Sequence, residues 1–90
     1  MKFKKFEIRK PTILGFPPTE DYYKYNFDVV KWANDNSYCE SICRLAYNKQ
    51  AGFFDFRSIG DRYLKHREDG LEEWITTWCR LKELEYEHEA

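Results

Sequence analysis

Three cysteines and a histidine are the side chains whose chemistry is most specific in this sequence. Cys39 and Cys43 are four residues apart, so on a helix they would share one face. With Cys79 and His66 they supply the thiolate and imidazole groups that hold zinc in a tetrahedral site. Structural zinc sites usually have closer ligand spacings, and cysteine is also one of the residues most often buried as a small apolar side chain. We therefore expect no metal and no cofactor.

The same groups are poor candidates for catalysis. A catalytic cysteine needs an imidazole that lowers its pKa and donors that stabilise an oxyanion. His66 lies in a stretch of charged residues and His88 in an acidic segment. The sequence also has no glycine-rich phosphate loop and no metalloprotease or serine-hydrolase motif. We expect a protein that is not an enzyme.

Charge is distributed unevenly along the 90 residues, whose net charge is −1. Residues 1–10 carry five cations and one anion, whereas residues 68–90 carry two cations and eight anions. Cations interleaved with aromatic rings can follow a nucleic-acid backbone, and an acidic segment can steer a domain towards a basic surface. The charge distribution is therefore compatible with a nucleic-acid partner and with a protein partner that has a basic surface.

Nucleic acid is the alternative partner. The basic N-terminal strand carries cations beside phenylalanines, and residues 38–67 have the spacing of a helix-turn-helix if 38–51 and 59–67 are both helical. DNA-binding modules usually carry a net positive charge, so this alternative is not favoured. The residues that it would use are Lys2, Lys4, Lys5, Arg57, Arg62, Lys65 and Arg67.

Another protein is the favoured partner. Aromatic residues make up 19 % of the chain, and the interior of so small a domain has limited room for them. Tyrosine and tryptophan at a surface often become binding hot spots. We predict a non-catalytic protein-binding domain that occupies a partner's surface, as a small inhibitor, an immunity-type protein or a phage-encoded regulatory protein would. The residues predicted to contact the partner are Tyr22, Tyr23, Tyr25, Phe27, Trp32, Glu83, Glu85 and Glu87.

The N-terminal third indicates strands first. Alternation around Phe6 and Ile8 predicts an edge strand over residues 2–10, and the apolar residues of 13–16 predict a short second strand. Residues 19–35 fit either a helix capped by Thr19 or a strand with alternating tyrosines. A strand that ends near residue 25, followed by a helix, is a compromise between the two. We slightly favour a helix in the second half of this segment.

The rest of the chain has helical spacing. Ser37 and Glu40 form a capping box that predicts a helix over 38–51, and a brief helix is expected over 59–67. The last segment is the clearest, because Leu71, Trp74, Ile75, Trp78 and Leu81 follow one another at helical offsets. Its face around residues 74–78 is expected to anchor the core, and its glutamate-rich end is expected to fray.

These elements define the expected fold class. It is α+β, a small single domain over residues 1–90 with one or two N-terminal β-strands packed on three or four α-helices. No segment reaches the roughly 20 apolar residues of a membrane-spanning helix, so no membrane partner is expected. The odd number of cysteines indicates a reducing, cytoplasmic environment. A homodimer through the edge strand or the last helix stays open.

Overall fold

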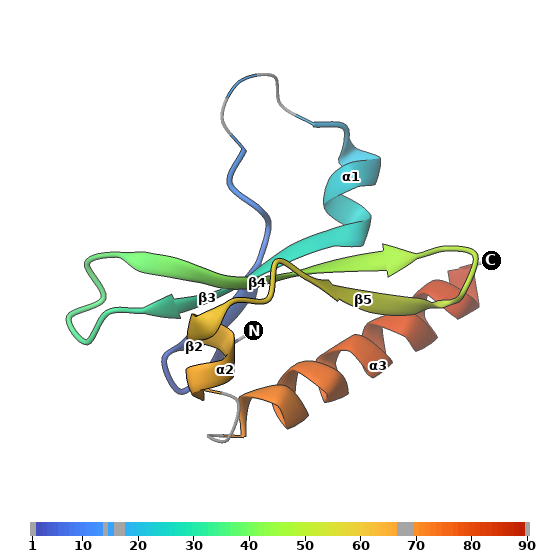
Figure 1. Ribbon diagram of the computed structural model, residues 1–90. Coiled ribbons are helices and arrows are strands. Elements are labelled where there is room, and N and C mark those ends of the chain that lie inside the picture. Colours follow the sequence, from blue (N-terminus) through green and yellow to red (C-terminus); the bar gives the residue numbers. More distant parts are fainter. Residues whose placement is uncertain (1, 14, 16–17, 67–69, 90) are drawn as a thin grey trace.

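One antiparallel sheet organises the chain. The computed structural model describes residues 2–13, 15, 18–66 and 70–89. In this part, five strands pair in the order in which they occur in the sequence, and three helices flank them (Figure 1). The strands are β1 (Lys2–Phe3), β2 (Phe6–Arg9), β3 (Asn26–Trp32), β4 (Cys39–Asn48) and β5 (Phe53–Arg57), and the helices are α1 (Glu20–Tyr25), α2 (Asp61–His66) and α3 (Leu71–Glu89).

The two faces of the sheet differ because side chains alternate along each strand. One face, here called the α3 face, supplies the core residues Phe6, Ile8, Val29, Cys43, Leu45 and Phe54. Figure 1 shows α2 and α3 on this side, and α1 lies before β3, where Lys24 contacts the C-terminal end of α3. The opposite face carries polar side chains, among them Arg9, Asp28, Arg44 and Arg57.

Helix α3 closes the core and confirms the predicted last helix. Leu71, Ile75, Cys79 and Tyr86 are buried along one stripe at helical spacing. The anchoring stripe is therefore offset from the predicted one, because Trp74 and Trp78 are only half-buried. The helix continues to Glu89, so its glutamate-rich end belongs to the helix.

The predicted balance of strands and helices is wrong. Instead of one or two N-terminal strands on three or four helices, the described residues form a five-stranded sheet with three helices. The main error is the segment 38–51, which was expected to be helical and forms β4 and the turn after it. Ser37 does not cap a helix, because its backbone N–H and its hydroxyl both donate to the Asp35 carboxylate in the β3–β4 turn.

A β-bulge explains why β4 has helical spacing. Cys43 lies opposite Val29 and Ser41 lies opposite Val30, so Ile42 is an extra residue on β4. Ile42 and Cys43 are consecutive and both buried, and an extra residue shifts the alternation by one position. The same shift places Cys39 and Cys43 on opposite faces of the sheet, although a helix would have put them on the same face.

Residues 19–35 contain both predicted structures, in the reverse of the order that we favoured. The Thr19 hydroxyl accepts from the backbone N–H of Tyr22 and caps α1, as predicted. The Asn26 side chain donates to the carbonyl of Tyr22, and the chain enters β3 at this residue. The helix is therefore in the first half of the segment, and the favoured helix in the second half is wrong.

The remaining predicted elements have mixed outcomes. The buried positions of Phe6 and Ile8 confirm the N-terminal strand, which turns at Lys4 and so forms both β1 and β2. Helix α2 confirms the brief helix predicted over 59–67, with Arg67 outside the described residues. Ile13 is not in a strand, and residues 14 and 16 of the predicted second strand lie outside the described residues.

None of the described helices is both long enough and apolar enough to span a bilayer.

Two apolar residues of α3 test the assigned stripe. Ile75 is fully buried, whereas Leu81 is 57 % exposed. Ile75→Ala should lower the free energy of unfolding by about 2–5 kcal/mol, because it leaves a cavity under the helix. Leu81→Ala should change it by less than about 1 kcal/mol. Urea denaturation followed by circular dichroism measures both, and equal losses would contradict the assigned stripe.

Candidate functional site

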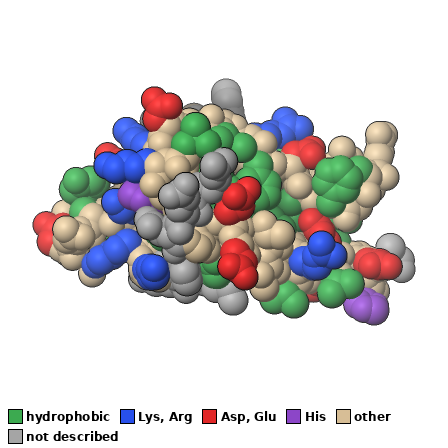
Figure 2. Space-filling model, turned by 60° about the horizontal axis from the view of Figure 1, so that its bottom comes forward, with side chains coloured by type: hydrophobic (Ala, Val, Ile, Leu, Met, Phe, Trp, Pro, Cys, Tyr) green, Lys and Arg blue, Asp and Glu red, His purple; other side chains and the backbone are tan. Residues whose placement is uncertain are grey.

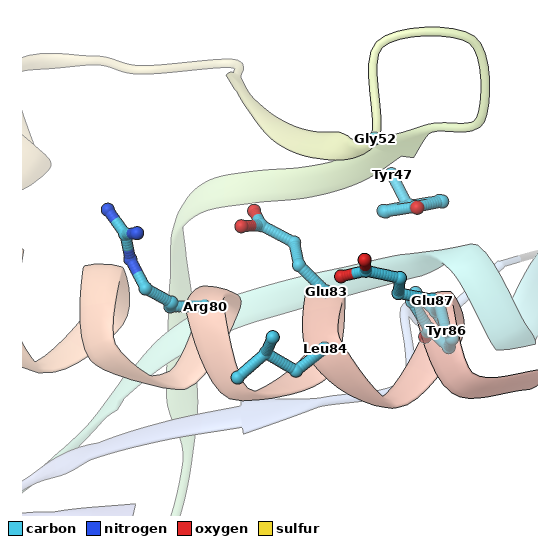
Figure 3. A pocket seen from close by; sticks show the side chains of 7 residues that line it. All are labelled: Tyr47, Gly52, Arg80, Glu83, Leu84, Tyr86 and Glu87. Carbon is cyan, nitrogen blue, oxygen red and sulfur yellow. The ribbon is translucent and has the colours of Figure 1, made fainter.

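A groove lies between the C-terminal half of α3 and the β4–β5 hairpin. Its volume is about 350 Å³, and its lining residues are Tyr47, Gly52, Arg80, Glu83, Leu84, Tyr86 and Glu87. We call it the α3 groove. Figure 3 shows Glu83 and Glu87 pointing from the helix towards the hairpin that carries Tyr47 and Gly52.

The hairpin side of the groove is set by a short turn. The side-chain oxygen of Asn48 accepts from the backbone N–H groups of Gln50 and Ala51, and Gly52 donates to the carbonyl of Asn48. Gly52 has a φ of 80°, in the left-handed region that favours glycine. The turn closes at the end of β4, and Tyr47 is the residue of that strand that lines the groove.

The helix side of the groove follows from helical spacing. Arg80, Glu83, Leu84 and Glu87 occur at offsets 0, 3, 4 and 7, so they lie on one strip beside the buried stripe. Leu84 is 48 % exposed, so it presents an apolar side chain to the groove. Figure 2 shows apolar and acidic side chains close together at the end of the molecule where α3 ends.

Contacts to α1 and β4 hold this end of α3 in place. The Tyr86 hydroxyl donates to the carbonyl of Lys24, and burial raises the pKa of the Tyr86 phenol. Lys24 also pairs with Glu89 at 2.7 Å, and this contact raises the pKa of the lysine. The rings of Tyr25 and Tyr47 pack against Tyr86 with centroids 5.2 and 4.7 Å away. These contacts connect the helix wall of the groove to α1 and β4.

The two carboxylates of the groove have different tasks. Glu83 accepts the backbone N–H of Phe54 at 2.9 Å, which satisfies a donor on the outer edge of β5. Glu87 is exposed, and the described residues give it no hydrogen bond or ion pair. Glu83 is thus a structural group, while Glu87 is available to a ligand.

The lining of the groove offers both apolar contact and negative charge. Leu84 and the ring of Tyr47 offer apolar contact, and Glu87 offers charge. Burial raises the pKa of Cys43 and of Cys79 to about 12, which disfavours the thiolate form of both side chains. Among the described residues, no three His, Cys, Asp or Glu side chains are grouped so that they could hold a metal ion.

The predicted partner-binding aromatics do not form one surface. Tyr22 and Tyr23 are half-buried on α1 and contact each other edge to face. Tyr25 and Phe27 pack into the aromatic cluster on the α3 face. The Trp32 indole N–H donates to Glu7 on the opposite face of the sheet.

Two of the three predicted glutamates lie at the same site. Glu83 and Glu87 line the α3 groove, whereas Glu85 pairs with Lys82 at 3.4 Å along the helix. The lining residues that the sequence did not indicate are Tyr47, Gly52, Arg80, Leu84 and Tyr86. Helical offsets from Glu83 would have found Arg80 and Leu84, but Tyr47 was assigned to a helix.

The residues of the nucleic-acid alternative are dispersed. Lys4 and Lys5 form the β1–β2 turn, Lys2 lies in β1, and Arg57 lies on the opposite face of the sheet from α3. Arg62 and Lys65 are exposed on α2, and Arg67 is outside the described residues. The helix-turn-helix is wrong, because its first half is β4.

Known proteins add no constraint to this picture. A scan against protein-family models, a search of curated proteins and a search of solved structures found no match to this chain.

The hydrogen bond from β5 to Glu83 gives a second test. Glu83→Ala should lower the free energy of unfolding by about 1–3 kcal/mol, because the N–H of Phe54 loses a charged acceptor. Glu87→Ala removes the same charge one turn further along and should change stability by less than about 0.5 kcal/mol. Chemical denaturation of both variants measures the difference. A Glu87 variant that is as unstable as the Glu83 variant would contradict these roles.

Proposed function

We propose that this protein is a non-catalytic protein-binding domain that holds a segment of a partner protein in the α3 groove. The observation that carries the proposal is the exposed Leu84 side chain next to the Glu87 carboxylate in a preformed concavity. Binding sites of this kind combine an apolar anchor with a few polar groups that fix orientation. In this proposal the protein acts only by occupying the partner's surface.

The partner segment carries lysine or arginine beside apolar residues. Six glutamates against Arg80 and Lys82 leave α3 with a net charge of −4, and its last turn adds the negative end of the helix dipole. A field of this sign speeds the approach of a basic segment. The aliphatic stem of lysine or arginine can cover Leu84 while its charged end reaches Glu87.

A domain of this kind acts as a small inhibitor, an immunity-type protein or a phage-encoded regulator, since each of these works by contact alone. Cys39, Cys43 and Cys79 are free thiols in the structure. Free thiols support a cytoplasmic site of action, where glutathione keeps cysteines reduced.

Selection of peptides from a random display library on the full chain tests this proposal. The selected peptides should contain lysine or arginine next to aliphatic or aromatic residues. Leu84→Ser and Glu87→Gln should each weaken a selected peptide at least about fivefold, because one removes the anchor and the other the charge. Fluorescence anisotropy of the labelled peptide measures the affinity.

Leu64→Ser is the matched control. Leu64 is 52 % exposed on α2, so this change alters a similar leucine outside the groove and should leave peptide affinity within about twofold. Peptides without basic residues, or peptides that Leu84→Ser does not affect, would contradict the proposal. A dimer of the chain that buries Leu84, detected by sedimentation, would contradict it as well.

A further inference from the structure

A row of charged side chains crosses the face of the sheet opposite α3. Strand pairing places Arg9 opposite Asp28, Asp28 opposite Arg44, and Arg44 opposite Arg57. Neighbouring strands are about 4.8 Å apart, so the four side chains form one line from β2 to β5. The line holds three guanidinium groups and one carboxylate.

The β2–β3 end of this row is satisfied within the protein. Asp28 is buried and accepts from Nε of Arg44 at 2.9 Å. That hydrogen bond raises the pKa of Arg44 and keeps its side chain in place. The guanidinium group of Arg9 donates to the Thr12 hydroxyl and contacts Sγ of Cys39. No ligand is needed to explain this end.

The β4–β5 end is open, and the ion pair of Arg57 there is long. The Arg57 side chain is 63 % exposed, and its nearest carboxylate, on Asp55, is 4.0 Å away. Within the described part of the chain, the Nη atoms of Arg44 and Arg57 donate no hydrogen bond. Like charges directly opposite each other on adjacent strands are unfavourable. Asp28 and Asp55 each offset part of this repulsion, and an anion bound between the two arginines would relieve the rest.

An exposed ring lies on the same surface. Phe53, Asp55 and Arg57 alternate along β5 onto one face, and Phe53 is 50 % exposed there. Aromatic rings beside cations on an open sheet are what single-stranded nucleic acids bind, because unpaired bases stack on the rings while cations contact phosphates. An acidic peptide would satisfy the arginines but would leave Phe53 unused.

We propose that the β4–β5 half of this face binds single-stranded nucleic acid, with a phosphate held between Arg44 and Arg57 and a base stacked on Phe53. The site is on the other side of the sheet from the α3 groove, so it does not depend on the proposed protein binding. Of its three residues, only Arg57 belongs to the set that the sequence indicated for nucleic acid.

Fluorescence anisotropy with labelled U12 and dT12 oligonucleotides, titrated with the full chain at about 50 mM salt, tests this site. Binding should weaken with rising salt with a logarithmic slope of about −0.7 to −1.4, as expected for one or two phosphates. Arg57→Gln and Phe53→Ser should each weaken binding at least about fivefold. Both side chains are exposed, so circular dichroism should show folded variants.

Arg80→Gln is the matched control, because it removes the same charge from the α3 side and should change affinity less than about twofold. Equal weakening by Arg57→Gln and Arg80→Gln would overturn the site in favour of a general charge effect. Absence of an anisotropy change up to about 100 μM protein would also overturn it, because even non-specific binding is usually tighter. Binding of a polyglutamate peptide in place of either oligonucleotide would assign the face to an acidic protein instead.

Discussion

The fold depends on one long helix, α3, which with the short helix α2 covers one face of a five-stranded sheet. At about 1.5 Å per residue, the 19 residues of α3 span roughly 28 Å, but a helix is only about 10 Å wide. The sheet is about twice that width. Large rings fill the remaining space, as Trp78 does where it meets Phe27 edge to face with centroids 4.8 Å apart. The high aromatic content is therefore largely a packing requirement.

Because α3 covers only one face of the sheet, the α3 groove and the arginine row lie on opposite sides of the protein. Tyr86 and Glu83 connect the C-terminal half of α3 to α1 and β5, and two glutamates line the groove beside it. The opposite face of the sheet has no long helix over β4 and β5, and arginines are exposed there (Figure 1). Of the N-terminal cations, Arg9 lies on the face opposite α3, whereas the acidic C-terminal residues lie along α3 itself.

Sequence patterns predicted some elements and missed others for identifiable reasons. Helix α3 was predictable because Leu71 and Ile75 continue one helical period over several turns. Strand β4 was not, since the bulge at Ile42 interrupts the alternation that identifies a strand. Assigning β4 to a helix removed the hairpin, and with it the wall of the groove that Tyr47 provides.

The candidate site was predictable only in part, because it depends on contacts between residues that are distant in sequence. Glu83 and Glu87 were identified from their position in an acidic segment, but their different tasks depend on Phe54, which is distant in sequence. The aromatic residues were assigned to the surface because composition cannot show how wide a sheet α3 has to cover. Pairing across strands, which sets the arginine row, is likewise not visible in a single sequence.

Nuclear Overhauser effects measured on the labelled protein test most directly whether α3 covers a sheet that includes β4 and β5. Phe54 directs its N–H to Glu83, so Tyr47–Phe54 and Leu45–Phe56 are pairs whose Hα atoms approach closely. The account predicts strong Hα–Hα cross-peaks for both pairs and ring cross-peaks between Trp78 and Phe27. Helical chemical shifts over residues 39–48, without these cross-peaks, would contradict it.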